Sequence, residues 1–396
     1  MSKPKIRFKG YEEDWEQRKL PEFVTFFNGL TYTPDDVEET GTLVLRSSNV
    51  KNGEIVDADN VYVNDKVVTS ENVQEGDIIV VVRNGSRALI GKHAQIKAPM
   101  PNTVIGAFMS GIRSEHSSFV NALLDTSAFE NEIAKNMGAT INQITGYMFS
   151  KMEFMIPSGE EQQKIGEYFQ SFDDLITLHQ RKCEETKKLK KYMLQKMFPQ
   201  NGKRVPEIRF AGFTDDWEQR KLGDVTELKS ASRVHKGEWT DSGVPFFRSS
   251  DVMAAINGTT NEKAYISEEL YEKLSNASGK LEEGDVLVTG GGSVGNPYIV
   301  PNNEPLYTKD ADLLWIKNQG RFYPYFLYEY FFSPTFRIYL SSISHVGTIA
   351  HYTITQLSET PISLPDIEEQ IKVGEYFESL DRLITLHQRQ YQKLFQ

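Results

Sequence analysis

The chain has very little cysteine and no long hydrophobic run. Cys183 is the single cysteine among 396 residues, which excludes a disulfide framework and favours a reducing, cytoplasmic location. No apolar stretch approaches the roughly 18 residues of a membrane-spanning helix, and the first residues do not have the pattern of a signal peptide. We therefore expect a soluble protein of the cytoplasm.

Positive charge is also scarce. Lysine and arginine total 44 against 55 aspartate and glutamate, which gives a formal net charge of −11. Proteins that bind DNA unaided usually have a basic balance, because neutralising phosphates supplies much of their affinity. If this chain binds nucleic acid, either its basic residues are clustered locally or a partner makes many of the phosphate contacts.

Recognisable catalytic motifs are absent as well. The sequence has no Walker phosphate-binding loop, no His-Glu-x-x-His metal motif and no nucleophile elbow. Residues 290–295, GGGSVG, fit the Gly-x-Gly-x-x-Gly pattern of dinucleotide-binding proteins, and Asp310 lies about 20 residues further on. That pattern needs a helix directly after the glycines, whereas Asn296-Pro297-Tyr298 and a β-like run follow. We therefore interpret the glycines as a tight turn whose bare backbone could approach a ligand.

Two stretches of the chain occur twice. Residues 4–20 (PKIRFKGYEEDWEQRKL) return as residues 206–222 (PEIRFAGFTDDWEQRKL), with 12 of 17 positions identical. Residues 160–182 (EEQQKIGEYFQSFDDLITLHQRK) return as residues 368–390 (EEQIKVGEYFESLDRLITLHQRQ), with 17 of 23 identical. The segments between them resemble each other only faintly. This arrangement predicts two domains that share a scaffold and recognise different things.

The variable segments have the patterns of both strands and helices. Short β-like runs such as residues 77–82 and 285–288 are separated by Gly, Asn and Pro, while residues 119–137 and 323–341 are typical of helices. The predicted fold class is therefore α+β, with two similar domains that each mix helices and strands.

The repeated segment that begins at Glu160 predicts a long helix with a coiled-coil seam. Ser158 is a suitable N-cap, and the apolar positions step by four and three residues. The seam consists of Ile165, Phe169, Phe172, Ile176, His179 and Cys183, with Val373, Phe377, Leu380, Ile384 and His387 in the second copy. The first copy continues to Phe198, whereas the second ends near the counterpart of Lys188, so we expect a shortened second helix. Such a helix cannot bury its seam alone, and the obvious partner is the other copy.

Polar loops with Arg, Asn, Ser and Thr recur at matching places in both halves. Arginine recognises guanine, asparagine and glutamine recognise adenine, and hydroxyls hold phosphates. The candidate DNA-contacting residues are Arg46, Ser47, Asn49, Arg83, Asn84, Ser86, Arg87, Thr140, Asn142 and Gln143 in the first half and Lys229, Ser230, Arg233, Lys236, Arg248, Ser249, Gly291, Gly292, Ser293, His345, Thr348, His351 and Tyr352 in the second. For any one of them a solvated loop is the alternative. The shared Arg-Ser-Ser could equally be a turn of the scaffold.

Taken together, these elements resemble the specificity subunit of type I restriction–modification enzymes. The resemblance covers essentially the whole chain and depends on the paired RF-x-G boxes, the Glu-Gly-Asp strand starts and the two LITLHQR helices. It implies two target-recognition domains joined by two long helices that pair as an antiparallel coiled coil, with internal pseudo-twofold symmetry. It also implies that the chain is not itself an enzyme.

The resemblance further implies a division of the chain and a set of partners. The expected parts are a first target-recognition domain at residues 1–158, a spacer helix at 159–199, a second target-recognition domain at 200–366 and a C-terminal spacer helix at 367–396. Each domain would recognise one half of a bipartite target in double-stranded DNA, and the helices would set the unread spacer and dock two methyltransferase subunits. Restriction (motor–nuclease) subunits would join that core. The methyltransferase would bring S-adenosylmethionine, and no cofactor or metal is expected in this chain.

Two other functions stay open at this point. One is a coiled-coil scaffold without direct DNA contact, and self-association through the helices would fit it. The other is a nucleotide-binding enzyme that uses the glycine turn at 290–295, although the first half has no such pattern at residues 83–91.

Overall fold

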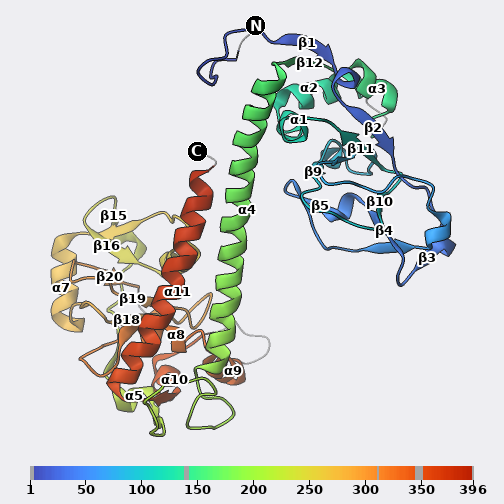
Figure 1. Ribbon diagram of the computed structural model, residues 1–396. Coiled ribbons are helices and arrows are strands. Elements are labelled where there is room, and N and C mark those ends of the chain that lie inside the picture. The colour runs from blue at the N-terminus through green and yellow to red at the C-terminus, as the bar shows by residue number, and fades with distance from the viewer. Residues whose placement is uncertain (1–3, 138–141, 310–311, 344–350, 395–396) are drawn as a thin grey trace. The chain divides into compact units, whose positions relative to one another are not determined.

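The computed structural model describes residues 4–137, 142–309, 312–343 and 351–394. The chain forms two compact units, residues 1–177 and 178–396. The long helix α4 (Gly159–Lys196) belongs to both, with its N-terminal half in the first unit and its C-terminal half in the second (Figure 1). Across the described ranges, no helix is both long and apolar enough to cross a membrane.

The first unit contains two four-stranded sheets. One sheet is antiparallel and has the order β2-β11-β8-β9, formed by Thr25–Asn28, Met109–Arg113, Ile78–Val81 and His93–Gln95. The other has the order β10-β4-β7-β3, with β10 parallel to β4, and is formed by Thr103–Ile105, Thr42–Leu45, Val61–Val63 and Val37–Glu38. Two-stranded pairs are β1 (Glu16–Lys19) with β12 (Glu153–Ile156) and β5 (Val50–Lys51) with β6 (Glu54–Ile55). The helices besides α4 are α1 (Ser117–Leu124), α2 (Ser127–Asn136) and α3 (Gly146–Lys151).

The second unit repeats this topology. Its antiparallel sheet has the order β14-β21-β18-β19, formed by Leu228–Ser230, Leu313–Ile316, Val286–Thr289 and Pro297–Ile299. Its mixed sheet has the order β20-β16-β17-β15, formed by Tyr307–Thr308, Val244–Phe247, Ala264–Ile266 and Trp239–Thr240. β13 (Glu218–Lys221) pairs with β22 (Pro361–Leu364). The helices are α5 (Leu222–Val225), α6 (Ser249–Asn257), α7 (Glu268–Ser278), α8 (Pro324–Tyr330), α9 (Pro334–Ile343), α10 (Ile354–Ser358) and α11 (Ile367–Lys393).

The central strand of each antiparallel sheet is buried on both faces. In β8, Ile78 and Val80 pack against the helical layer of the first unit, while Ile79 and Val81 pack into a second core toward the mixed sheet. In β18 the side chains alternate in the same way. An uninterrupted run of β-branched and leucine side chains suits such a strand, because each face meets an apolar layer. The predicted mixed α and β fold of each half is therefore confirmed.

A buried ion pair connects each long helix to the repeated box at the start of its domain. Arg7 donates two hydrogen bonds of 2.7 Å to Glu161 in the first turns of α4, and Arg209 makes the same two bonds with Glu369 in α11. Both carboxylates are buried. The paired charges hold the pKa of Arg209 above its ordinary value, chiefly through the hydrogen bonds that Arg209 donates to Glu369. The identical residues of the two repeats thus include both members of each pair.

We expect Glu369→Ala to lower the free energy of unfolding of the second unit by about 2 kcal/mol, because it leaves a mostly buried guanidinium without its carboxylate. Glu185→Ala removes an exposed pair with Arg181 on α4 and should change the free energy of unfolding by less than about 0.5 kcal/mol. Urea unfolding followed by circular dichroism measures both variants. Similar small effects would contradict an anchoring role for the buried pair.

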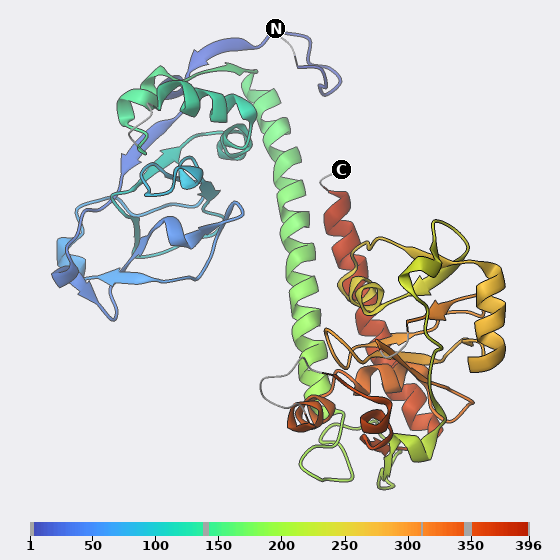
Figure 2. The ribbon, with the colours of Figure 1, turned by 180° about the vertical axis from the view of Figure 1, so that it is seen from behind.

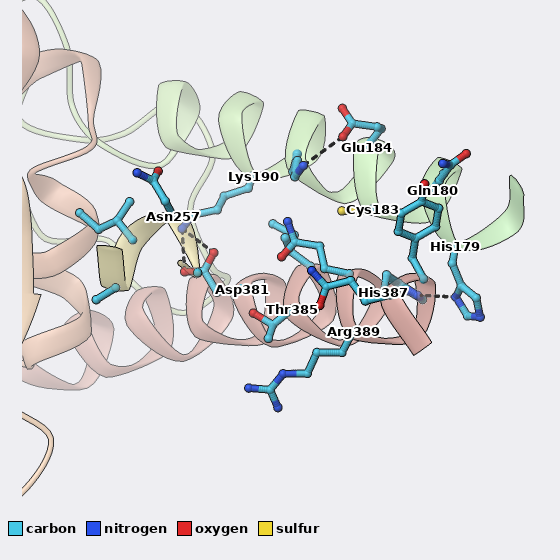
Figure 3. Close-up of a pocket in the computed structure, with 18 of the residues that line it drawn as sticks. His179, Gln180, Cys183, Glu184, Lys190, Asn257, Asp381, Thr385, His387 and Arg389 are labelled. Carbon is cyan, nitrogen blue, oxygen red and sulfur yellow. Dashed lines mark hydrogen bonds and ion pairs between the residues drawn. The ribbon is translucent and has the colours of Figure 1, made fainter. Parts of the chain in front are cut away.

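Helices α4 and α11 run antiparallel where they meet in the second unit (Figures 1 and 2). His179 Nδ1 lies 3.1 Å from His387 Nδ1, and Lys190 Nζ lies 2.7 Å from both carboxylate oxygens of Asp381, so the contacts fall in opposite order along the two helices. His179 and His387 are the same position of the repeat, as a local twofold relation requires. A groove of about 1170 Å³ opens between the helices at Cys183 (Figure 3).

The predicted seam residues do not form one continuous helix–helix contact. Val373, Phe377 and Leu380 are buried in the core of the second unit, where α11 packs against α8. Ile165 packs against the core of the first unit, while Phe169 is about half exposed. Phe172, Ile176 and Ile384 are half-buried, and Cys183 is buried. In the second unit the first half of the repeat therefore packs into the core of its own domain, and in the first unit Ile165 does the same.

Lys190 in α4 also reaches a second acid, Glu329 in α8, at 2.7 Å. Glu329 is fully buried, and burial raises its pKa to about 8, with the nearby Asp381 acting in the same direction and Lys190 opposing both. A folded-state pKa above the unfolded value means that the proton stabilises the fold. That contribution is complete below pH 4.5, the ordinary pKa, and is lost as the pH rises through about 8.

We expect Glu329→Gln to remove this pH dependence, because the amide still accepts from Lys190 and carries no charge to desolvate. The variant should gain on the order of 2 kcal/mol of stability relative to the parent between pH 5 and pH 9. Glu378→Gln, at a site on α11 paired with the exposed Arg382, is the matched control and should leave the pH profile unchanged. Thermal unfolding of the parent and of both variants at a series of pH values measures the pH dependence of stability. Parallel profiles for parent and Glu329→Gln would refute the assignment.

Candidate nucleic-acid interface

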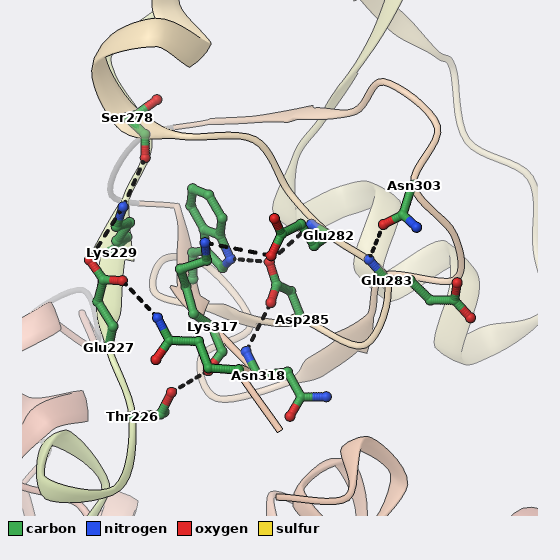
Figure 4. Close-up of polar contacts among 12 residues, drawn as sticks. Thr226, Glu227, Lys229, Ser278, Glu282, Glu283, Asp285, Asn303, Lys317 and Asn318 are labelled. Carbon is green, nitrogen blue, oxygen red and sulfur yellow. Dashed lines mark hydrogen bonds and ion pairs between the residues drawn. The ribbon is translucent and has the colours of Figure 1, made fainter. Parts of the chain in front are cut away.

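The Glu-Gly-Asp motif fixes the start of the central strand in each unit. Asp285 accepts hydrogen bonds from Trp315 Nε1, at 2.7 Å, and from the backbone amides of Glu282 and Asn318 (Figure 4). Asp77 accepts from Arg113 and from the amide of Gln74. Both aspartates are buried. The strand is thereby fixed at its beginning, and its far end leads into a loop that contains predicted DNA-contacting residues.

In the first unit three of the predicted loops lie together beyond the end of β8. Asn84 donates to Ser47 Oγ at 3.2 Å, which joins the loop after β8 to the loop after β4. Asn142 donates to the carbonyl of Gly85 at 3.1 Å, and Gln143 forms a backbone bridge with Arg83. Side chains predicted from three distant segments are therefore neighbours.

The second unit brings the equivalent loops together. The amide of Gly290 donates to the carbonyl of Asp312, and Ser249 Oγ donates to that same carbonyl. The amide of Tyr352 donates to the carbonyl of Gly290 at 2.8 Å. The strand register places Ser230, at the end of β14, opposite Leu314 at this same edge. The loop that contains Arg233 and Lys236 therefore leaves the sheet beside the glycine turn.

The glycine turn does not have the geometry of a dinucleotide site. Gly292 and Gly295 have φ angles of +69° and +76°, so the turn needs glycine. Strand β19 follows it directly, and no helix N-terminus in the described residues after the turn is placed to receive a pyrophosphate. Asp310 lies outside the described residues. The turn instead leaves Ser293 exposed on a backbone with little side-chain cover.

The shared arginine of the two Arg-Ser-Ser segments is already engaged. Arg46 donates to the carboxylate and carbonyl of Asp59 at 2.6 Å, and Arg248 donates to Asp251 and lies over the ring of Trp239. These contacts favour the interpretation of the segment as a turn of the scaffold.

The structure corrects the prediction for two of the candidate DNA-contacting residues, because both are buried. Asn49 is completely buried, where its side chain bonds the backbone of Arg46 and Ala58. Tyr352 is also buried, and its hydroxyl lies against Thr360 Oγ1. Their hydrogen-bonding capacity is used inside the protein, so neither side chain can reach a base.

The remaining candidate DNA-contacting residues differ in how exposed their side chains are and in whether neighbouring residues already bind them. Lys229 is held by Glu227 and the carbonyl of Ser278 (Figure 4). Gly291 is buried, whereas Asn84, Asn142, Gln143 and Ser249 are half-buried and engaged with neighbouring loops. The exposed candidates are Arg83, Ser86, Arg87, Ser230, Arg233, Lys236, Gly292, Ser293 and His351, and Ser47 is half-buried. Thr140, His345 and Thr348 lie outside the described residues.

This surface also includes an exposed aromatic residue, Phe108, which the sequence analysis did not predict. Phe108, 55% exposed, directly precedes β11, and the guanidinium of Arg83 lies 5.0 Å from the centre of its ring. The carbonyl of Phe108 accepts from the amides of Val82 and Arg83, so the backbone joins the two segments. A phenylalanine in a Gly-Ala-Phe-Met segment looks like core in sequence, and only the strand register turns it outward.

The chain belongs to the family of type I restriction–modification DNA specificity proteins. The family model for the type I restriction modification DNA specificity domain matches residues 12–188 and again residues 214–396. The two matches correspond to the two copies of the fold described above.

The chain is similar to specificity subunits of other type I restriction enzymes and to a solved S-subunit structure. The chain is 23% identical to the type I restriction enzyme MjaVIII specificity subunit of Methanocaldococcus jannaschii, over 96% of this chain and 89% of that protein. It is 22% identical to the StySPI specificity subunit of Salmonella potsdam, over 70% of this chain and 61% of the relative. The crystal structure of the type I restriction–modification S subunit from M. genitalium superposes with a TM-score of 0.62 and 14% identity, covering 99% and 96% of the two chains. This likeness supports the fold.

The effect of a substitution on stability distinguishes loop residues that hold the fold together from loop residues that are free at the surface. We expect Asn49→Ala to lower the free energy of unfolding of the first unit by about 2 kcal/mol, because it leaves buried backbone groups without partners. Arg87→Ala, at an exposed position of the neighbouring loop, should change it by less than about 0.5 kcal/mol. Chemical denaturation tests the pair, and a large effect of Arg87→Ala would mean that this residue also belongs to the scaffold.

Proposed function

We propose that the chain is the DNA-recognition subunit of a type I restriction–modification complex, in which each unit recognises one half of a bipartite, asymmetric target. One observation carries the proposal: two copies of one fold present the same three loops at the same edge of the same sheet, and the loops differ in sequence. A scaffold kept twice with different loops suits one task performed on two different base sequences.

The loop surface of the first unit has the chemistry for such contacts. Arg83 and Arg87 are exposed, and within the described residues neither has an ion pair with a carboxylate. Arginine can donate two hydrogen bonds to guanine in the major groove, while Ser86 and backbone amides suit phosphates. Phe108 offers an apolar surface for a thymine methyl group or a sugar.

Partners complete the function that we propose. The chain has a net charge of −11, so much of the phosphate neutralisation would come from other subunits. Methyltransferase subunits with S-adenosylmethionine would carry the chemistry, restriction subunits would join them, and this chain would be non-catalytic. The unbroken α4, 38 residues or roughly 57 Å long, would help to set the unread spacer between the half-sites.

Mapping of methylated bases tests the proposal. We expect co-expression of the chain with a type I methyltransferase subunit to place N6-methyladenine at a single bipartite motif with a constant spacer. Replacing residues 21–157 by the corresponding segment of another family member should change one half of the motif and leave the other. A stable complex with scattered or absent methylation would contradict the assignment.

Two arginines provide the residue-level test. The double variant Arg83→Ala/Arg87→Ala should still assemble with the methyltransferase but bind the motif at least tenfold more weakly, with a smaller salt dependence, as lost phosphate or base contacts require. Arg18→Ala, at an exposed arginine of β1 paired with Glu16, is the control and should bind like the parent. Equal DNA affinity of the double variant and the parent would remove this loop from the interface.

A further inference from the structure

The far end of the central strand has the same backbone contact in both units. In the first unit, the carbonyl of Phe108, the residue before β11, accepts from the amide of Val82, the residue after β8. In the second unit, the carbonyl of Asp312, the residue before β21, accepts from the amide of Gly290, the residue after β18. The strand register therefore makes Phe108 and Asp312 equivalent positions of one fold.

The residue opposite this position is also equivalent in the two units, but its chemistry differs. Arg83 and Gly291 each lie two residues beyond the central strand. The guanidinium of Arg83 lies over the ring of Phe108, 5.0 Å from its centre. In the second unit, Oδ1 of Asp312 lies 3.3 Å from the Cβ atom that a side chain at Gly291 would add. The same place in the fold thus presents a cation in one unit and an anion in the other.

The hydrogen-bond donors of Arg83 are available to a ligand. Arg46 and Arg248 donate to carboxylates, whereas Arg83 is exposed and has no ion pair with an acid among the described residues. An aromatic ring attracts a guanidinium through its π face and takes up no conventional acceptor. Phe108 therefore restricts Arg83 before DNA binds, which lowers the entropy lost on binding. Guanine is the base whose major-groove edge offers two acceptors, N7 and O6, to one arginine.

Asp312 has the opposite hydrogen-bonding chemistry. Its side chain is one third exposed and pairs with Lys309 at 2.5 Å, and a carboxylate keeps further acceptor positions after one such pair. Lys309 also offsets a negative charge that DNA phosphates would repel. Cytosine presents the N4 donor alone in the major groove, whereas adenine presents the N7 acceptor beside its N6 donor. A carboxylate therefore suits cytosine better than adenine.

We propose that these equivalent positions each select one base, with opposite hydrogen-bonding polarity. Arg83, positioned by Phe108, donates to a guanine in the half-site of the first unit, and Asp312 accepts from a cytosine in the half-site of the second. The inference rests on the proposed function, since it names bases within the two half-sites. It also explains the glycine at 291, because a side chain there would stand against the carboxylate of Asp312.

Modified DNA tests the role of Arg83. The full chain is assembled with a type I methyltransferase subunit, and its motif is mapped. Each guanine in the half that changes when residues 21–157 are exchanged is then replaced by 7-deazaguanine, which lacks the N7 acceptor. We expect the parent complex to lose at least tenfold in affinity at one guanine, and Arg83→Ala to lose less than twofold there.

Two substitutions of Phe108 test its positioning role in the same assay. Phe108→Tyr keeps the ring under the guanidinium and should show the same loss on 7-deazaguanine as the parent. Phe108→Ala should show a smaller loss, because Arg83 is then no longer held in place before binding. Equal losses for the parent and Phe108→Ala would remove the positioning role.

Methylation mapping tests the role of Asp312. Asp312→Ala should relax the motif at one G·C pair of the second half and leave the first half unchanged. Asp312→Asn should shift the preference at that pair toward A·T, because an amide pairs with N6 and N7 of adenine. Glu304→Ala is the control at an exposed carboxylate whose neighbour, Asn303, accepts from the amide of Glu283 near the opposite end of β18. It should leave both halves unchanged.

The outcomes separate this inference from the proposed function. A parent complex that methylates one bipartite motif but tolerates 7-deazaguanine throughout the first half would overturn the role of Arg83 and leave DNA recognition intact. A first half without a G·C pair would do the same. Relaxation by Asp312→Ala at an A·T pair, or at no pair, would overturn the role of Asp312. Failure of the parent complex to methylate any bipartite motif would overturn the proposed function and this inference with it.

Discussion

The buried pair between an arginine of the repeated box and a glutamate of the following helix is the contact on which each half depends. The box lies at the start of the domain and the helix at its end, so Arg7–Glu161 and Arg209–Glu369 close the chain of each domain on itself. A carboxylate buried this deeply needs its cation, because an unpaired charge in the interior costs several kcal/mol. This mutual need explains why both partners are identical in the two repeats while most of the intervening sequence differs.

The central strand of each antiparallel sheet is likewise held by a few buried contacts. Asp77 and Asp285 fix its beginning, both of its faces are buried, and its far end is left free to carry loops of different sequence. Loops anchored by a rigid strand can change without disturbing the core, because their backbone groups are satisfied by one another and by water. The exposed Arg83 and Phe108 in one unit and the bare glycine turn in the other are two results of that freedom.

The long helices serve two purposes along their length. Their first turns are part of the domain core, as Val373 and Phe377 demonstrate, and only positions further on, such as His179 with His387, meet the other helix. The seam pattern alone does not distinguish these uses, since a period of 3.5 suits a sheet-covering helix over a few turns as well as a coiled coil. The partly buried Lys190 pairs with both Glu329 in α8 and Asp381 in α11, so one network links the domain core to the contact between the two helices.

The sequence by itself determined the two-domain plan, the mixed α and β class, the long helix and the family, because repeats and periodicity are properties of the chain that need no coordinates. It also located the loops, since Gly, Asn and Arg clusters interrupt the strands. Only the tertiary structure decided which loop residues are available. Asn49 and Tyr352 are buried, Arg46 is held by Asp59, and Phe108 is turned outward. Exposure depends on strand register and on neighbours far away in the chain, and a local pattern does not contain that information.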